Sequence, residues 1–353
     1  MPMGNVSNTN WIEADTIVWL NTSYLGDLIL STLAFNAFKA RFPDKKQYLI
    51  TSHVGKASLE SHGSLDKVIV FDKRSRGFLK TAKLVKSQLG GCSPNNTILI
   101  QAHRSFRSSF LAKFLGFSTI TYQESSLSFL ADIRLPRSSV LHESLRIGLL
   151  LEPLGIGREA LAKERMSLAN SDASSHLKDT LKNQKEMIAI APGSVWGTKR
   201  WPAESYGELL KRILSDTDYS VVLLGSPNEK DVCQTVLSVA NDSTRVLNLA
   251  GHTSLSDLLY IYPKLKLLVA NDSSPIHFAS AFDIPTIAIF GATVSGMGFG
   301  PLAKRSKVVE LSQADVPCRP CSDHGPKECP LGHFDCMVKI NPARVFEELK
   351  KTL

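Results

Sequence analysis

The stretch LLVANDSSPIHFASAFDIPTIAIFG, residues 267–291, has the pattern of a strand, a polar turn, a short helix and a second strand. Its first four residues form a continuous apolar run, which is typical of a parallel strand covered on both faces. Asn271 to Ser274 follow that run, and Pro275 stands where a helix is expected to begin, because the first helical position does not use a backbone N–H. The stretch therefore predicts a βαβ unit with a polar turn where open α/β sheets bind nucleotides.

Apolar runs alternate with amphipathic stretches along most of the chain, and this alternation predicts a parallel sheet in each half. The strands expected in the first half are 16–20, 47–51, 67–71, 97–101 and 119–122, and those expected in the second half are 187–191, 220–224, 245–249, 267–270 and 286–290. The expected helices are 27–41, 77–89, 106–115, 140–154, 203–215, 229–240, 254–262 and 275–282. The predicted fold class is therefore α/β.

The chain has 353 residues, which is more than a single hydrophobic core usually holds. Residues 166–186 are polar and show no apolar periodicity, so we expect a linker there. The sequence thus predicts two Rossmann-like domains, residues 1–170 and 171–353, with parallel sheets that face each other across a cleft. We expect the last helix to pack back on the N-terminal domain.

The net charge of +8 favours an anionic partner, although a mildly basic surface without such a partner is an equally good interpretation. The basic residues are spread along the chain and do not alternate with aromatic residues, which argues against nucleic acid and fits contact with an anionic membrane. No stretch has the roughly 18 consecutive apolar residues of a membrane span. The first fifteen residues lack a signal-peptide pattern, so we expect a cytoplasmic protein.

Polar segments follow two strands of the first half. Asp27 comes after the first strand and before a helical pattern, so its carboxylate either caps that helix or faces the cleft as a functional group. His103, Arg104 and Arg107 come after the fourth strand. They either cap and flank a helix in solvent or bind an anionic ligand, and their position and charge favour the second interpretation.

The loop PGSVWGTKRWP, residues 192–202, follows the first strand of the second half. It places Ser194, Lys199 and Arg200 before a helix that Pro202 can start, and a lysine beside an arginine suits a diphosphate. The loop lacks the Walker spacing GxxxxGK[ST], and GxGxxG follows none of the expected strands. These observations argue against kinases, ATPases and ordinary dehydrogenases.

Glu229 follows the next strand, in the sequence GSPNE. Ser226 and Glu229 have the spacing of a capping box, with Pro227 in the first turn, so the start of a helix accounts for these residues. This segment alone gives no support for a ribose-binding role of Glu229.

Four cysteines lie within nineteen residues near the C-terminus, with two histidines between them: Cys318, Cys321, Cys329 and Cys336. A tetrahedral zinc site that holds a loop-rich segment is one interpretation. The irregular spacing leaves the alternative that the cysteines are reduced and serve packing.

The chain resembles the glycosyltransferase family 9 enzymes from about Thr16 to the C-terminus. The resemblance is carried by motifs in family order and spacing: Leu25-Gly26-Asp27, the loop 192–202, the turn 225–229, the segment 248–251, and Asn271 to Ser274 with His277. Within the family, the chain is most similar to the ADP-heptose:lipopolysaccharide heptosyltransferases of the second type. It differs at Ser274, where many relatives have glycine, and a side chain there narrows the approach to the backbone.

The resemblance implies a GT-B architecture and an inverting transfer without a metal or other cofactor. It implies that the N-terminal domain binds the acceptor, that the C-terminal domain binds the nucleotide sugar, and that Asp27 is the general base. The donor-binding residues that it implies are Ser194, Lys199, Arg200, Glu229, Asp272, Ser273, Ser274 and His277.

The implied substrates are ADP-heptose and a phosphorylated, carboxylate-bearing lipid sugar of the lipid A-Kdo-heptose type. Such an acceptor suits His103, Arg104 and Arg107, and it implies peripheral contact with the anionic inner membrane from the cytoplasmic side. Two alternatives stay open. One is a family 9 transferase that uses another nucleotide sugar or acceptor, and the other is a noncatalytic module that binds a sugar nucleotide.

Overall fold

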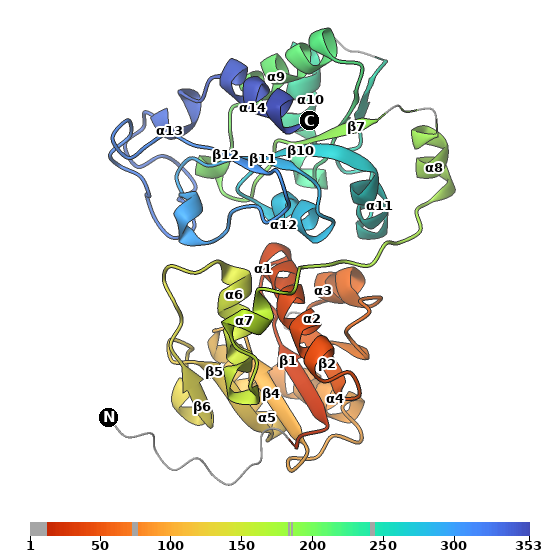
Figure 1. The fold of residues 1–353 in the computed structure, drawn as a ribbon, viewed down its shortest axis with the longest axis vertical. Coiled ribbons are helices and arrows are strands. Elements are labelled where there is room, and N and C mark those ends of the chain that lie inside the picture. Colours follow the sequence, from red (N-terminus) through yellow and green to blue (C-terminus); the bar gives the residue numbers. More distant parts are fainter. Residues whose placement is uncertain (1–12, 73–76, 183, 185, 241–243) are drawn as a thin grey trace. The chain divides into compact units, whose positions relative to one another are not determined.

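The computed structural model describes residues 13–72, 77–182, 184, 186–240 and 244–353. The chain divides into two compact units, Met1–Ala169 and Asn170–Leu353. The described part of each unit forms a six-stranded parallel sheet with helices packed against it (Figure 1). The predicted α/β fold class is confirmed.

The N-terminal unit follows the expected alternation of strands and helices. Its strands are β1 (Thr16–Leu20), β2 (Lys46–Thr51), β3 (Lys67–Val70), β4 (Thr97–Gln101), β5 (Ser118–Tyr122) and β6 (Ile133–Leu135). Its helices are α1 (Leu25–Leu30), α2 (Thr32–Arg41), α3 (His53–Leu59), α4 (Phe78–Gln88), α5 (Phe106–Leu115), α6 (Glu143–Gly148) and α7 (Arg158–Leu161), with the 3-10 turns η1 (Ser128–Leu130) and η2 (Leu149–Leu154). The sequence did not predict β6, α3 and α7.

The C-terminal unit repeats this architecture. Its strands are β7 (Met187–Ala191), β8 (Ser220–Leu223), β9 (Val246–Asn248), β10 (Leu265–Asn271), β11 (Thr286–Ile289) and β12 (Lys307–Val309). Its helices are α8 (Ser175–Leu181), α9 (Ala203–Asp216), α10 (Lys230–Val239), α11 (Leu255–Ile261), α12 (Ser274–Ala281), α13 (Asp335–Val338) and α14 (Pro342–Thr352). Among the described residues of either unit, none of the helices combines the length and apolar character needed to cross a membrane.

Both sheets have the same strand order. The N-terminal sheet reads β3-β2-β1-β4-β5-β6, and the C-terminal sheet, taken from its other edge, reads β9-β8-β7-β10-β11-β12. In this doubly wound order, the first and fourth strands of each unit are neighbours at the centre of the sheet, and the chain connections lead away from them in opposite directions. This point is the switch point, where ligands bind. The loops after β1 and β4 flank it in one unit, and the loops after β7 and β10 flank it in the other.

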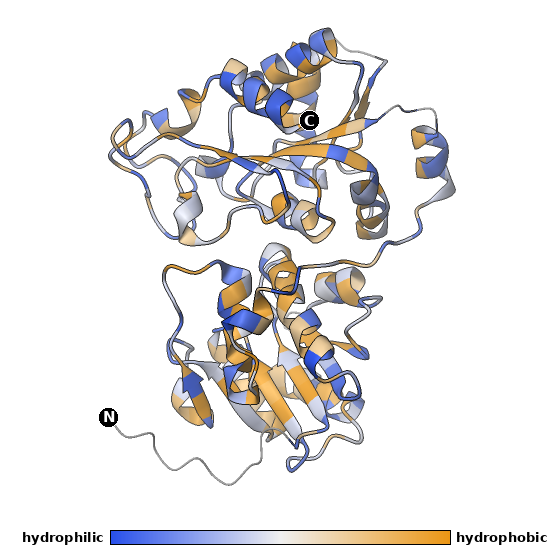
Figure 2. Cartoon of the chain, in the orientation of Figure 1, coloured by the Kyte–Doolittle hydropathy of each residue, from blue (hydrophilic) through white to orange (hydrophobic). Residues whose placement is uncertain are grey.

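The central strands form the core of each sheet. Every residue of β1, β4 and β7 is buried, and Figure 2 shows the apolar composition of the central strands in orange. β6 and β12 lie at sheet edges, are three residues long and contain the charged residues Arg134 and Lys307. A search for continuous apolar runs misses such strands because they are only partly covered.

The helical pattern over 27–41 is interrupted in the structure, where α1 and α2 meet at Ser31. The Ser31 hydroxyl donates to the carbonyl of Asp27 (3.3 Å) and accepts from the side-chain amide of Asn21 (2.8 Å). A serine that hydrogen bonds one turn back tends to bend a helix, and apolar periodicity does not report this competition.

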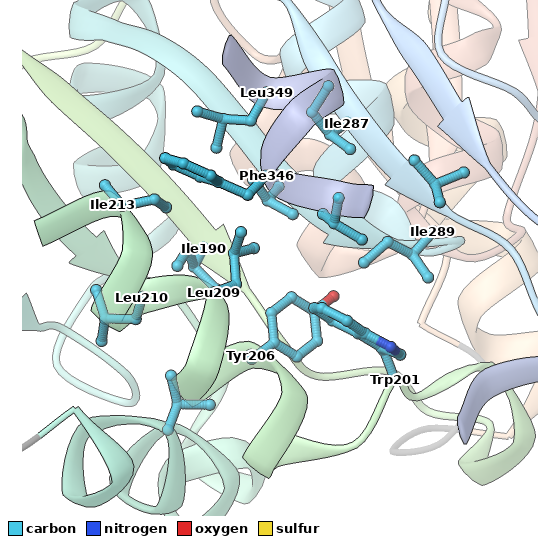
Figure 3. Packing of buried hydrophobic residues seen from close by; sticks show 14 of the residues in the cluster. Ile190, Trp201, Tyr206, Leu209, Leu210, Ile213, Ile287, Ile289, Phe346 and Leu349 are labelled. Carbon is cyan, nitrogen blue, oxygen red and sulfur yellow. The ribbon is translucent and has the colours of Figure 1, made fainter. Parts of the chain in front are cut away.

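The last helix, α14, packs on the C-terminal unit. Figure 3 shows its residues Phe346 and Leu349 among buried side chains that include Ile287 and Ile289 of β11. α14 also contacts α9. The apolar face of this helix is therefore covered by its own unit, and contact of the helix with the N-terminal domain stays a prediction.

Candidate active site

A buried amide at the end of β10 holds the loop between β7 and α9. The Asn271 amide nitrogen donates to the carbonyl of Pro192 (2.8 Å), and its oxygen accepts from the N–H of Trp201 (3.0 Å) and the hydroxyl of Tyr206 (2.9 Å). Asn271 has no exposed surface, so each unmade hydrogen bond would cost the desolvation of its group. Both ends of the loop 192–201 are thus fixed to the strand on the other side of the switch point.

Lys199, Asp272 and Thr293 meet beside that loop. Lys199 Nζ lies 2.6 Å from Asp272 Oδ2, and the Thr293 hydroxyl donates to the same oxygen over 2.7 Å. The side chains of Lys199 and Asp272 are 12% and 6% exposed, so water screens their interaction weakly. The three residues follow β7, β10 and β11, at one edge of the sheet. An anion that reached Lys199 would compete with Asp272 for a largely desolvated ammonium group.

Ser194 and Arg200 stabilise the loop itself. Arg200 Nε donates to the carbonyl of Ser194 over 2.7 Å, and the Ser194 hydroxyl accepts from the N–H of Trp196 over 3.3 Å. Ser194 is buried, whereas Arg200 is exposed. The two residues therefore fix the conformation from which Lys199 reaches Asp272.

Glu229 forms the capping box that its spacing with Ser226 predicts. Its carboxylate accepts from the N–H of Ser226 over 2.7 Å in the turn before α10. The same side chain lies against Gly193, because a Cβ atom added to that glycine would come within 2.1 Å of the Glu229 carboxyl carbon. Glycine at this position lets the loop of Lys199 approach Glu229, so the structure places this carboxylate next to the loop.

The polar turn after β10 leads directly into α12. This helix begins at Ser274, one residue earlier than expected, so Pro275 is the second helical residue. Ser273 is the N-cap residue, but its hydroxyl donates to the carbonyl of Asn271 (3.3 Å) and does not cap the helix. His277 is buried in the same turn. The first N–H groups of α12 are thus not capped by Ser273, which suits an anionic ligand.

Asp27 and His103 follow β1 and β4, the two strands at the switch point of the N-terminal sheet. Their segments are joined, since the Thr22 hydroxyl lies 2.8 Å from His103 Nδ1. Asp27 is half-buried in the first turn of α1, and the N-cap residue of that helix is Tyr24. The Asp27 carboxylate is therefore not the N-cap of its helix.

The residues that the sequence predicts to bind the acceptor, His103, Arg104 and Arg107, lie around the start of α5. His103 Nδ1 is 2.9 Å from Ser108 Oγ, and Ser105 caps the helix by accepting from the N–H of Ser108. Arg104 and Arg107 are exposed. Ser105, and not His103, therefore makes the helix cap, while the exposure of Arg104 and Arg107 fits both a solvated flank of the helix and a site for an anionic ligand.

The four cysteines, for which the sequence leaves a zinc site and reduced packing cysteines as alternatives, differ in their burial. Cys336 packs into the apolar core of the C-terminal unit, where burial raises the pKa of its thiol to about 11. Cys318, Cys321 and Cys329 are half-buried. Within the part of the chain that the structure describes, no three His, Cys, Asp or Glu side chains are grouped as metal ligands.

The cysteine segment supports the loops of the Lys199 site. Arg319 is buried, and its guanidinium donates to the carbonyl of Thr293 (2.8 Å) and to the carboxylate of Glu310 (2.8 Å). The Thr198 hydroxyl donates to the carbonyl of Pro326 over 2.5 Å. The segment thus contacts Thr293 and also Thr198, the neighbour of Lys199, and so supports both groups that bind Asp272.

Residues 85–328 match the family described as Glycosyltransferase family 9 (heptosyltransferase). This chain belongs to glycosyltransferase family 9. Lipooligosaccharide heptosyltransferase 2 of Campylobacter jejuni is 26% identical to it over 332 residues, which cover 93% of this chain and 96% of the relative. The predicted family and the predicted glycosyltransferase activity are confirmed.

Two solved structures share the fold of this family 9 chain. The glycosyl transferase family 9 protein from Veillonella parvula has a TM-score of 0.81 at 20% identity, covering 98% of this chain and 99% of its own. The E. coli ADP-heptose lps heptosyltransferase II has a TM-score of 0.74 at 22% identity, covering 96% of this chain and 98% of its own. The predicted GT-B class is confirmed.

The sequence did not indicate roles for Thr22 in the N-terminal unit, or for Thr293 and Arg319 in the C-terminal unit, of this family 9 chain. The two threonines follow buried strands at the same sheet edges as Asp27 and Asp272, and that position is a signal that the sequence contains. Arg319 lies in a stretch without periodicity, so its burial could be found only in the structure.

Proposed function

We propose that this glycosyltransferase moves a heptose from ADP-heptose to the inner core of lipopolysaccharide, on an acceptor of the lipid A-Kdo-heptose type, with inversion at the anomeric carbon. The Campylobacter jejuni relative is named a heptosyltransferase, and the E. coli structure is named for ADP-heptose. The observation that carries the proposal is the buried pair of Lys199 and Asp272 at the switch point, a position that suits the diphosphate of a nucleotide sugar.

The donor site consists of the loop 192–201 and the turn after β10. The diphosphate accepts from Lys199, Arg200 and the first N–H groups of α12. A helix N-terminus contributes only about 0.3–1 kcal/mol near a surface, so the two cations neutralise most of the charge on the leaving diphosphate. Glu229 binds the nucleoside, and the remaining donor contacts come from Ser194, Asp272, Ser273, Ser274 and His277.

Asp27 acts as the general base on the acceptor. Its carboxylate takes the proton of the acceptor hydroxyl, whose oxygen attacks the anomeric carbon of the heptose. The bond from that carbon to ADP breaks with its electron pair on the phosphate oxygen. His103, Arg104 and Arg107 bind the acceptor on the same edge of the N-terminal sheet, and their charge suits its phosphate and carboxylate groups.

A lipid acceptor requires contact with the inner membrane from its cytoplasmic side, and we assign this contact to α4 and α5. These helices touch each other and contain no Asp or Glu. Phe106 and Phe110 are 58% and 45% exposed, with their rings stacked 6.2 Å apart. The exposed apolar, aromatic and basic residues of this α4–α5 surface are Leu79, Lys80, Lys83, Leu84, Lys86, Phe106, Arg107, Phe110 and Lys113. Exposed aromatic rings among cations suit an anionic lipid interface.

The deciding experiment incubates the purified protein with ADP-heptose and a truncated lipid acceptor and reads the product by mass. The expected result is an acceptor heavier by one heptose residue, formed equally well in EDTA. Faster transfer from another nucleotide sugar in a donor panel would replace the substrate assignment. Binding of ADP without transfer from any donor would identify a noncatalytic module.

A further inference from the structure

The N-terminal unit contains a cavity that the proposed mechanism does not use. Its volume is about 240 Å³, and it lies between the carboxyl ends of β5 and β6 and the helical segments α6, η2 and α7. Leu135 and Leu149 form part of an apolar wall, and Tyr122, Arg137 and Arg146 are among its polar lining residues. A concave apolar site with a few polar groups is the usual form of a small-ligand site.

Tyr122 contributes to this cavity a buried hydroxyl whose hydrogen bonding is incomplete. Its side chain is 2% exposed, and among the described residues its hydroxyl has no hydrogen-bond partner. Burial, and to a smaller extent the charge of Glu143, raises the pKa of this hydroxyl, so it remains a donor at physiological pH. Most buried hydroxyls are hydrogen bonded, and one that lines a cavity can donate to a ligand.

The charges around Tyr122 favour an anion. The Glu143 carboxylate pairs with the guanidinium groups of both Arg137 and Arg146, at 3.0 Å in the second case. One negative charge therefore faces two positive charges, and Arg146 is buried. Glu152 and Arg158 also line the cavity, are exposed, and balance each other. Two further charges lie nearby: the Glu124 carboxylate accepts from the N–H of Arg137 (3.2 Å), and Arg104 acts on the Tyr122 hydroxyl. One positive charge is left over among all of these groups.

The elements that border the cavity contact the segments assigned to the acceptor. The carbonyl of Arg104 accepts from the N–H of Ser126 over 3.0 Å, which ties the loop after β4 to the loop after β5. α6, which contains Arg146, packs against α1, which contains Asp27. The cavity and the general base thus lie along the same edge of the N-terminal sheet.

We propose that this cavity binds an anionic group of the acceptor, a carboxylate or a phosphate, through the Tyr122 hydroxyl and the Arg137 and Arg146 guanidinium groups. The proposal rests on the proposed function, since it names a second point at which the same acceptor is held. It makes Tyr122 a binding residue that acts on acceptor affinity and not on the chemical step.

The test is Tyr122→Phe, which removes one hydroxyl and keeps the ring. A hydrogen bond to a charged group predicts an acceptor KM about 10-fold higher, with kcat and the Kd for ADP unchanged. The melting temperature should stay the same or rise, because an unpartnered hydroxyl is removed. Tyr48→Phe, in β2 and outside the cavity, is the matched control and should change none of these values.

Two exposed positions test the sign of the charge without affecting the core. Arg158→Gln should raise the acceptor KM about 2- to 5-fold, and Glu152→Gln should lower it by a similar factor, with both effects reduced by salt. Two modified lipid acceptors, one without phosphates and one with methyl-esterified carboxylates, distinguish whether the cavity binds a phosphate or a carboxylate. If the KM for one of these two acceptors is the same in the wild type and in Tyr122→Phe, that acceptor lacks the group that the cavity binds.

Calorimetric titration of the full-length protein with the same acceptors gives an answer that does not depend on turnover. Equal acceptor Kd for the wild type and Tyr122→Phe would overturn the cavity proposal while leaving heptose transfer intact. Failure of the wild type to transfer heptose would overturn the proposed function, and an acceptor Kd that still depends on the Tyr122 hydroxyl would support the cavity.

Discussion

Asp272 accepts from a cation and a hydroxyl at the same carboxylate oxygen, and this complicates any test of Lys199. Lys199→Met alone leaves a buried carboxylate without its cation, which destabilises a protein by about 3–5 kcal/mol whatever Lys199 does with ligand. Asp272→Asn removes that charge, and an asparagine can still bond to the Thr293 hydroxyl. The informative comparison is therefore between Asp272→Asn and the double variant.

We expect the double variant Lys199→Met, Asp272→Asn to bind ADP about 10- to 100-fold more weakly than Asp272→Asn alone. The reason is the loss of one charge-assisted hydrogen bond to the diphosphate, worth about 1.5–3 kcal/mol. Calorimetric titration with ADP measures it. Equal affinities in the two variants would show that Lys199 serves the fold and not the phosphate.

Asp27→Asn should lower kcat by about 10²- to 10⁴-fold, because an amide cannot take the proton of the acceptor hydroxyl. The Kd for ADP-heptose should not change, since the proposed donor site lies in the other unit. Asp15→Asn is the control, because Asp15 is an exposed aspartate just before the amino end of β1. Transfer by Asp27→Asn at the wild-type rate would remove Asp27 as the base.

Arg319 connects the cysteine segment to the loops that follow β11 and β12. Its guanidinium joins the loop after β11 to Glu310, and a lysine cannot reproduce such forked contacts. We expect Arg319→Lys to lower the free energy of unfolding of the full chain by roughly 3 kcal/mol, measured in denaturant. Arg212→Lys on the exposed side of α9 should change it by less than about 0.5 kcal/mol. Similar values for both variants would contradict this assignment.

The elements differ in how far the sequence predicted them. The bounds of α5 were predicted correctly, because Ser105 caps its start and Gly116 ends it in the left-handed conformation. The segment 27–41 was predicted as one helix, because apolar periodicity does not report the hydrogen bonds of Ser31 with Asp27 and Asn21 at the point where the helix is interrupted. Edge strands such as β6 carry too little apolar signal to be found.

At the scale of the whole molecule, the α4–α5 surface predicts binding to vesicles of phosphatidylethanolamine and phosphatidylglycerol. Replacing both Phe106 and Phe110 by serine should weaken binding at least about 10-fold, because each buried ring contributes roughly 1.5–3 kcal/mol. Flotation at low and high salt measures it. Leu331→Ser, at a side chain 64% exposed in the C-terminal unit, is the control. Unchanged flotation of the double variant would place the lipid contact elsewhere.

The stability of the chain should depend on His62 at acid pH. His62 is 4% exposed, its Nε2 lies 3.1 Å from the carbonyl oxygen of Ser167, and burial lowers its pKa from 6.5 to about 4. The folded state favours the neutral ring. Its contribution of about 3 kcal/mol is therefore complete above pH 6.5 and is lost as the pH falls toward 4.

Between pH 7.5 and 4.5, the wild type should lose about 2–3 kcal/mol more unfolding free energy than His62→Gln, in which no ring can be protonated. Denaturant titration at both pH values measures this difference. Because carboxylates and other groups titrate in both proteins, only the difference reports on His62. Equal losses would show that the ring is protonated in the folded state without cost.

The sequence by itself determined the two α/β halves and the loops that hold Asp27, Lys199 and Asp272. Buried parallel strands leave continuous apolar runs, and the residues that follow such strands are functional often enough to be singled out. Only the tertiary structure decided that Lys199 pairs with Asp272, that α14 packs on its own unit, and that Tyr122 borders a cavity. These features depend on which surfaces meet in space, and local periodicity does not record contacts between residues far apart in the chain.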